Sequence, residues 1–271
     1  MTEWRVGSSG FSYDEWVGPF YPEELPGAGR LAYYAARLPS VEINNTFYRM
    51  PGERVLAGWA SRVPPSFRFA LKAPRRITHA AKDADPSDAI AHLFRVVPAL
   101  GGTLGPVLFQ LPPWARKDVG RLRAMLALVP AGRRVAFEFR HASWLDDEVY
   151  AVLSEAGAAL CAADFDEADK KVALVATAPF GYLRLRAAAY DDAQLAAWVE
   201  TIRAQSWQDA FVFFKHEDSG TAPVLARRML AIAHGLPLDA EPPLPKRTAR
   251  PAEPRVARKR PPARREHGEA S

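Results

Sequence analysis

The stretch RVAFEFRH, residues 134–141, decides the fold class of this chain. Successive side chains of a β-strand point to opposite faces, so Phe137 and Phe139 share one face while Glu138 and Arg140 share the other. We expect the apolar face to pack against helices and the charged face to point into the interior of a closed sheet. The stretch therefore predicts a strand that carries ionisable groups at its carboxyl end.

Seven other stretches resemble it in length and composition. They are RVGSSG (5–10), SVEINNT (40–46), RFALKA (68–73), PVLFQL (106–111), AALCAADF (158–165), GYLRLR (181–186) and DAFVFFKH (209–216). Helix-like segments separate most of them and Asn-Gly hairpin turns are absent, which favours parallel pairing. Eight β-then-α units in about 235 residues predict an α/β protein with a single (β/α)8 TIM-type barrel.

Apolar residues spaced at i, i+3, i+4 and i+7 predict the helices between the strands. Helices are expected near residues 31–38, 56–63, 90–97, 149–156 and 195–202, with weaker ones at 118–129 and 221–234. Asp85 before Pro86 predicts one helix start, and Ser143–Asp146 reads as a capping box at another. Residues 167–177 show no helical period, and we expect a loop there.

The excess of positive charge lies in the last part of the chain. Of 36 basic and 31 acidic residues, nine and four fall in 240–271, which leaves 27 of each sign in 1–239. We therefore expect a barrel domain over 1–238 and a disordered, Pro/Arg-rich basic tail over 239–271. The tail has two open readings: weak nucleic-acid binding by counterion release, or a solubilising terminus without a partner.

Other bulk features favour a cytoplasmic protein. Cys161 stands alone, so the chain holds no internal disulfide. No apolar run approaches the length of a membrane span, and the first residues lack a secretory signal pattern. We expect no membrane partner.

Strand parity directs a set of polar side chains into the mouth at the carboxyl ends of the strands. The set has five cationic members (Lys72, Arg140, Arg184, Arg186, Lys215) and three anionic ones (Glu42, Glu138, Asp164). Asn44, Gln110 and His141 lie among them. The surplus of two positive charges indicates an anionic ligand, carrying a phosphate or a carboxylate.

Long motifs in the same order along the chain resemble the YecE-like family, also called domain of unknown function 72. The matching stretches are SSGFSYDEW (8–16), PFYPEEL (19–25), VEINNTFYR (41–49), Lys72 with Thr78-His79, LGPVLFQLPP (104–113), FEFRHASW (137–144), Asp164, YLRL (182–185) and the ending Phe213–His216. The resemblance implies a TIM-type barrel and no defined reaction. This chain departs from the family pattern at the mouth, where Arg186-Ala187 replaces a usual His-Gly and Lys215-His216 a usual Asn.

The carboxylates Glu42, Glu138 and Asp164 have two open roles. They suit acid/base catalysis or metal ligation, and they equally suit a structural network in which each neutralises an Arg or Lys, with Glu138 and Arg140 as the clearest pair. We favour the network for any one carboxylate and a ligand site for the ensemble. No metal is assigned, because His and Cys residues lack ligand spacing, and the cofactor is unknown.

Aromatic residues gather in the loops after the strands, among them Tyr13 and Trp16 after the first. They suit a stacking wall for a sugar or a base, or a satellite core that caps the barrel. Residues 7–10 are predicted to form a tight turn whose backbone amides could face an anion. Cys161 is predicted to be a buried thiol that faces the helices. Three functions stay open: a hydrolase or lyase acting on a phosphorylated or otherwise anionic substrate or a phosphodiester, a non-catalytic ligand-binding protein, and a nucleic-acid-associated protein tethered by its tail.

Overall fold

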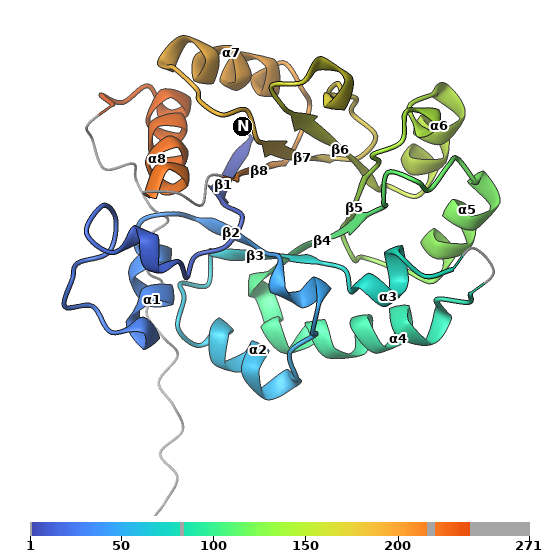
Figure 1. Ribbon diagram of the computed structural model, residues 1–271, viewed down its shortest axis with the longest axis horizontal. Helices are drawn as coiled ribbons and strands as arrows, with labels where there is room; N and C mark the ends of the chain where they lie inside the picture. Colours follow the sequence, from blue (N-terminus) through green and yellow to red (C-terminus); the bar gives the residue numbers. More distant parts are fainter. Residues whose placement is uncertain (1, 82–83, 216–219, 239–271) are drawn as a thin grey trace, which may run out of the picture.

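The computed structural model describes residues 2–81, 84–215 and 220–238. Over these ranges the chain forms eight strands: β1 (Glu3–Ser8), β2 (Ser40–Ile43), β3 (Arg68–Lys72), β4 (Leu104–Gln110), β5 (Val135–Glu138), β6 (Ala159–Asp164), β7 (Phe180–Leu185) and β8 (Asp209–Phe214). They pair in parallel in the order β1-β8-β7-β6-β5-β4-β3-β2. Figure 1 looks along the resulting ring, which confirms the predicted TIM-type barrel.

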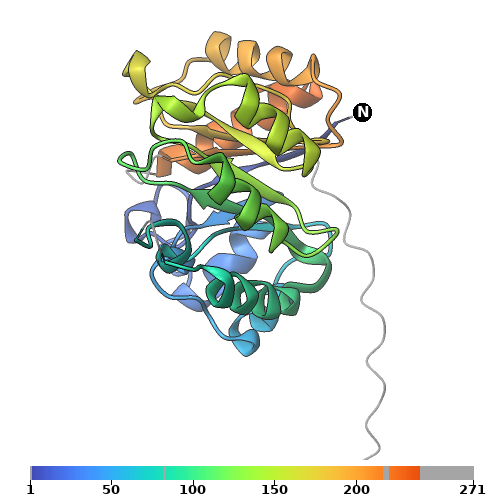
Figure 2. The ribbon, with the colours of Figure 1, turned by 90° about the vertical axis from the view of Figure 1, so that its right-hand side faces the viewer.

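Helices surround the strands, and Figure 2 shows them from the side. They are α1 (Arg30–Ala35), α2 (Glu53–Ala60), α3 (Arg75–Thr78), α4 (Ser87–Val96), α5 (Val119–Ala127), α6 (Asp147–Glu155), α7 (Asp192–Arg203) and α8 (Thr221–His234). Short 3-10 helices are η1 (Asp14–Trp16), η2 (Gly27–Gly29), η3 (Asn45–Phe47), η4 (Val97–Thr103), η5 (Ala142–Trp144) and η6 (Ala168–Lys170). None of the helices in the described ranges is long and apolar enough to cross a bilayer. The proposed tail, 239–271, and His216 lie outside the described residues.

Two apolar layers hold the barrel together. The larger lies between strands and helices and takes residues such as Phe109, Phe137 and Leu183 from the outer strand faces. The smaller gathers Ala70, Leu108, Ala136, Ala159, Cys161, Phe180, Tyr182, Phe211 and Phe213. These come from six different strands, and only the barrel interior brings them together. The interior is therefore a packed core below the polar mouth.

The ring closes between β1 and β2 through a side chain and a backbone bridge between Ser9 and Glu42. The hydroxyl of Tyr34, on α1, accepts a hydrogen bond from the Ser8 amide (2.9 Å) and donates one to the Ser40 carbonyl (3.0 Å). Nearer the mouth, the Gly10 amide donates to the Glu42 carbonyl at 2.8 Å. The amides of Ser8, Ser9 and Gly10 are thus used inside the fold, and the expectation that this turn faces an anion was wrong.

Two helix starts differ from the sequence prediction. Asp146 caps α6 by accepting from the Val149 amide at 3.1 Å, while the Ser143 hydroxyl accepts from the Lys117 amide at 2.8 Å. The predicted capping box at Ser143 was wrong, because η5 intervenes before the helix. Pro86 lies just before α4 instead of in its first turn, and Asp85 accepts from the Ser87 amide at 2.9 Å.

The segment 167–177 was expected to be a loop, and it is one except for η6 and a bridge between Val172 and Ala163.

Candidate ligand site at the carboxyl-terminal mouth

Arg184, on β7, lies at the centre of the mouth between two carboxylates, Glu42 from β2 and Glu138 from β5. Its Nη2 is 2.7 Å from Glu42 Oε1 and its Nη1 is 2.6 Å from Glu138 Oε2. The three side chains are 2%, 0% and 1% exposed, so this ion-paired triad is buried. Charges removed from water persist only when they are paired and hydrogen-bonded, and these are both.

Neutral groups complete the pairing of Glu42. Oε1 accepts from the Ser9 hydroxyl at 2.7 Å and from the Asn44 amide at 3.2 Å, and Oε2 accepts from the Tyr182 hydroxyl at 2.7 Å. Asn44 Oδ1 in turn lies 3.4 Å from Arg184 Nη2. The sequence had assigned Asn44 to the ligand, and here it helps to fix the carboxylate.

Glu138 is held by amide and guanidinium donors. Gln110 Nε2 donates to Oε2 at 2.7 Å, and Arg140 Nε lies 3.3 Å from Oε1, as the sequence predicted for this pair. Burial alone would raise the pKa of Glu138, but Arg184, Arg140 and Gln110 hold it below its ordinary value. An ionised carboxylate with both oxygens occupied is a fixed charge and a poor proton carrier.

The ion pairs and hydrogen bonds of the triad also fix the protonation states of Arg184 and Tyr182. Burial would lower the pKa of Arg184, yet Glu42 and Glu138 raise it, so the guanidinium stays charged. Burial and the neighbouring Glu42 raise the pKa of Tyr182 well above its usual value, which keeps the hydroxyl protonated as a donor. These groups form the structural network that the sequence left as an alternative.

Three further cationic side chains surround the triad, and they make few hydrogen bonds or ion pairs of their own. Lys72 Nζ lies 4.1 Å from the centroid of the Phe47 ring, and burial together with Arg184 lowers its pKa to about 8. Arg140 is 38% exposed. Arg186 is only 9% exposed, and its closest carboxylate atom is Glu138 Oε2 at 3.8 Å. Within the described ranges its buried Nε has no hydrogen-bond partner.

The expectation that Asp164 points into the barrel was wrong. Asp164 pairs in register with Leu185 and lies on the helix-facing side of β6, where it accepts from the Tyr190 hydroxyl (2.9 Å) and contacts Lys171 Nζ (3.1 Å). Cys161, correctly placed on the opposite face, therefore points into the core instead of toward the helices. Removing Asp164 from the inward set leaves five cations against two carboxylates, a surplus of three.

Lys215 and His141 lie at the rim of the mouth. Lys215 follows β8 and is exposed. His141 precedes η5, and its Nδ1 accepts from the Ser143 amide at 3.1 Å. Within the described ranges, neither side chain contacts the triad. The predicted site residues that the structure does bring together are Glu42, Asn44, Gln110, Glu138, Arg140, Arg184 and Arg186, with Lys72 beside them.

Most of the loop aromatics form a satellite core. Trp16 is fully buried and packs on Tyr13, Phe20 and Tyr21, so it presents no free face to a ligand. Tyr13 is partly buried, and its hydroxyl donates to the Ser9 carbonyl at 2.6 Å.

A different aromatic surface, which includes the loop residues Phe47 and Tyr48 that follow β2, lies next to Lys72. A groove of about 610 Å³ is lined by Phe47, Tyr48, Met50, Pro74, Arg75, Arg76, His79 and His92. Tyr48 is 81% exposed, and Trp114, whose ring centroid is 5.5 Å from that of His79, is 68% exposed. Burial and the cations Lys72, Arg75 and Arg140 lower the pKa of His79. The groove combines flat rings with positive charge.

No group of three or more His, Cys, Asp or Glu side chains in the described part of the chain is placed to hold a metal ion. A metal-binding role for the inner carboxylates finds no support in this geometry, since both are already occupied by arginine.

A family model described as "Protein of unknown function DUF72" matches residues 5–249. Among curated proteins, the UPF0759 protein YunF of Bacillus subtilis is 29% identical over 142 residues, which are 48% of this chain and 49% of YunF. The match thus spans about half the length of that relative.

Solved structures of the same family share the fold. A DUF72 family protein from Enterococcus faecalis is 20% identical with a TM-score of 0.71, covering 90% of this chain and 99% of that one. One from Thermotoga maritima is 24% identical with a TM-score of 0.66, covering 83% of this chain and 96% of that one. At these identities the likeness concerns the fold alone.

Proposed function

Because this chain belongs to the DUF72 family, whose description names no activity, we propose a function from the mouth itself. The protein binds an anionic, phosphate-bearing small molecule at the carboxyl-terminal end of its barrel. TIM-type barrels place their ligand sites at this end.

Arg186 is the observation that carries this proposal. Its guanidinium is nearly buried, lies 3.8 Å from an already occupied carboxylate, and makes no hydrogen bond to the residues that the structure describes. The guanidinium also lies 5.3 Å from the centroid of the Phe165 ring, which leaves its buried Nε without an acceptor. A buried N–H group without an acceptor is costly, and an anionic oxygen placed against it would satisfy it. The positive charges of Lys72 and of the partly exposed Arg140 beside it act in the same direction.

The groove next to Lys72 favours a ligand with a flat ring. The exposed Tyr48 and Trp114 offer stacking surfaces, and Arg75 and Arg76 add positive charge along the same wall. A phosphate held by Arg186 and Lys72, with a sugar or base toward Tyr48, fits both features.

Binding is tested by thermal melting of the full chain with matched ligands: ribose 5-phosphate against ribose, and AMP against adenosine. A ligand that binds the native state raises the melting temperature by mass action. We expect shifts with the phosphorylated members alone, and their loss in Arg186→Gln. Arg54→Gln, which removes an exposed arginine from α2, is the matched control and keeps the shift.

The pH dependence adds a second readout. Lys72 carries its charge below its pKa of about 8, so anion affinity falls as the pH rises from 7 to 9. Equal shifts with ribose and ribose 5-phosphate, or an unchanged shift in Arg186→Gln, contradict the proposal.

Where turnover accompanies binding, as a hydrolase or lyase, the proton carrier we propose is Lys72. Its pKa lies near neutrality, whereas Glu42 and Glu138 are locked in ion pairs.

A further inference from the structure

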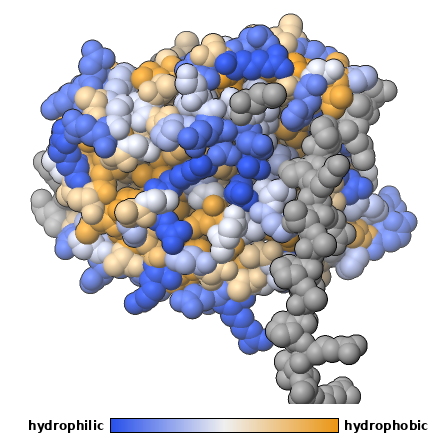
Figure 3. All heavy atoms as spheres, turned by 180° about the vertical axis from the view of Figure 1, so that it is seen from behind, coloured by the Kyte–Doolittle hydropathy of each residue, from blue (hydrophilic) through white to orange (hydrophobic). Residues whose placement is uncertain are grey.

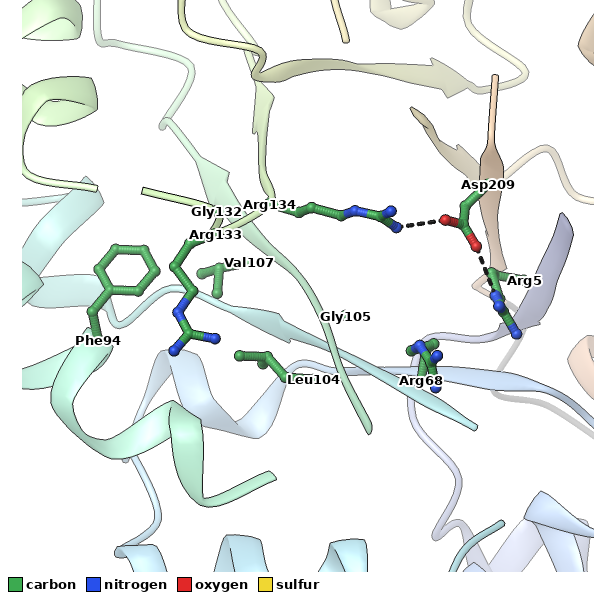
Figure 4. Close-up of a pocket in the computed structure, with 10 residues that line it drawn as sticks. All are labelled: Arg5, Arg68, Phe94, Leu104, Gly105, Val107, Gly132, Arg133, Arg134 and Asp209. Atoms are coloured by element: carbon green, nitrogen blue, oxygen red, sulfur yellow. Dashed lines mark hydrogen bonds and ion pairs between the residues drawn. The ribbon is translucent and has the colours of Figure 1, made fainter. Parts of the chain in front are cut away.

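A second charged cavity lies at the other end of the barrel, where β1, β3 and β8 begin. Its volume is about 190 Å³, and its charged lining is Arg5, Arg68, Arg133, Arg134 and Asp209, which we call the arginine pocket. In Figure 4, Arg5 and Arg134 converge on Asp209, Arg68 lies below them, and Arg133 lies at the far end near Phe94 and Leu104. Figure 3 views the molecule from this side, and hydrophilic residues gather across its centre.

Positive charge in the arginine pocket exceeds negative charge. Four guanidinium groups face one carboxylate, and Glu3 at the rim, 67% exposed, adds a second carboxylate 3.7 Å from Arg5. The arginines repel one another: burial and the positive charges of Arg5 and Arg134 lower the pKa of Arg68. A cluster of this kind attracts a ligand of at least two negative charges.

Asp209 accepts hydrogen bonds from only some of the guanidinium N–H groups in the arginine pocket. Its two oxygens bind Arg5 Nε at 2.9 Å and Arg134 Nη1 at 2.6 Å. Arg5 Nη1 donates to the Ser66 carbonyl (3.0 Å), and Arg68 Nη1 donates to the carbonyls of Pro65 (2.8 Å) and Phe67 (2.9 Å). Among the contacts of the described residues, Nη2 of Arg68 and Nη2 of Arg134 have no hydrogen bond.

These backbone contacts fix Arg5 and Arg68 in place before any ligand arrives, and preorganised guanidinium groups suit the paired oxygens of a phosphate. We propose that the arginine pocket is a second anion site, separate from the mouth, which binds a phosphate group between Arg68 and Arg134. Asp209 orients Arg5 and Arg134 and limits the net charge of the pocket.

The far end of the pocket indicates which phosphate compounds fit. Phe94, Leu104 and Val107 line it with apolar surface, and Arg133 adds a charge there. The volume corresponds to about six water molecules at their share of liquid volume. The pocket therefore accommodates inorganic phosphate, and equally a phosphomonoester with a short apolar group.

The two anion sites lie at opposite ends of the strands and share no residue. They are separated by the packed interior core, so one can be disabled without touching the other.

The test is calorimetric titration of the full chain with inorganic phosphate at constant ionic strength. We expect Arg134→Gln to weaken binding in the pocket by about tenfold or more, because a charge-assisted contact is lost. Arg134 is 39% exposed and its loss leaves the Arg5–Asp209 pair in place, which preserves folding. Arg54→Gln is the matched control for one lost surface charge, and Arg186→Gln disables the mouth alone.

Each pattern of results separates this inference from the proposed function. Binding that survives Arg186→Gln and is weakened in Arg134→Gln supports the arginine pocket. Binding lost in Arg186→Gln and unchanged in Arg134→Gln assigns phosphate to the mouth and overturns the pocket. An absence of phosphate binding in the unaltered chain overturns it as well. Phenyl phosphate that binds more tightly than inorganic phosphate identifies a phosphomonoester as the ligand, and equal affinity identifies free phosphate.

A second variant gives a readout that a purely structural network would not produce. Asp209→Asn removes the anion that neutralises Arg5 and Arg134, so the melting temperature falls in phosphate-free buffer. Phosphate then replaces the missing charge and raises the melting temperature of Asp209→Asn more than that of the unaltered chain. An equal rise in both proteins contradicts a phosphate beside these arginines.

Discussion

At the scale of single residues, Arg184 determines what the barrel interior can hold. Glu42 and Glu138 come from strands on different sides of the ring, and each contributes a full negative charge to a region without solvent. Their ionised state depends on one guanidinium that reaches both. Strand alternation in VEINNT, FEFR and YLRL predicted that these side chains share the interior, because each strand pairs an apolar face with a polar one.

Arg184→Met is expected to lower the free energy of unfolding by about 3–5 kcal/mol, since it leaves two buried carboxylates without their cation. Arg140→Met is the control: Arg140 also contacts Glu138, but it is 38% exposed, and we expect a change of about 1 kcal/mol or less. Urea unfolding of both variants at neutral pH measures the difference. Equal losses would mean that the triad does not depend on Arg184.

At the scale of elements, β6 shows where strand parity fails. Before its last residue, Asp164, β6 is apolar on both faces, so one terminal carboxylate was the only contrast in this strand from which to choose the inner face. The structure uses the small Ala159 and Cys161 inside, where Phe211 and Phe213 fill the space, and turns Asp164 outward. Strands with a clear polar face, such as β2, β5 and β7, were oriented correctly.

The seam between β1 and β2 is another element-level feature that sequence patterns did not predict. Tyr34 belongs to an ordinary apolar helix stripe, yet its hydroxyl joins the two strands. Only the three-dimensional arrangement shows that a side chain reinforces the backbone bridge between Ser9 and Glu42 there.

Tyr34→Phe tests the seam, because it removes one oxygen and leaves the ring packing unchanged. The Ser8 amide and the Ser40 carbonyl lose a buried partner, and we expect destabilisation of about 1–3 kcal/mol. Tyr150→Phe on α6 is the matched control, since its hydroxyl makes no hydrogen bond to the described residues, and we expect almost no change. Chemical denaturation of both variants gives the comparison, and equal stability of the two would argue against a bridging role.

At the scale of the whole molecule, the barrel and the location of its mouth followed from the repeated strand–helix pattern. The arginine pocket did not, because its residues lie at the beginnings of strands that are far apart in sequence. Parity arguments followed the carboxyl ends, where ligand sites of barrels are expected. An isolated Arg or Asp at a strand start carries no local signal of the partners that the closed ring will provide.

Both ends of the barrel contain a carboxylate that arginines keep ionised, and this predicts how the molecule responds to acid. Burial would raise the pKa of Glu138 and of Asp209, but the arginines around each hold both below their ordinary values of 4.5 and 3.8. A lowered pKa in the folded state contributes stability that is present above the ordinary value and lost as the pH falls through the folded value. The free energy of unfolding should therefore stay nearly constant from about pH 7 to about pH 5 and decrease below the ordinary values.

Urea unfolding at several pH values measures this dependence, and the double variant Glu138→Gln/Asp209→Asn isolates its cause. The double variant is less stable at neutral pH, because Arg184, Arg5 and Arg134 lose their counter-charges. It should also lose less stability between pH 5 and pH 3 than the unaltered chain, since neither position can take up a proton. An identical decrease in both proteins would assign acid sensitivity to other carboxylates and would show that the two ends of the barrel do not control it.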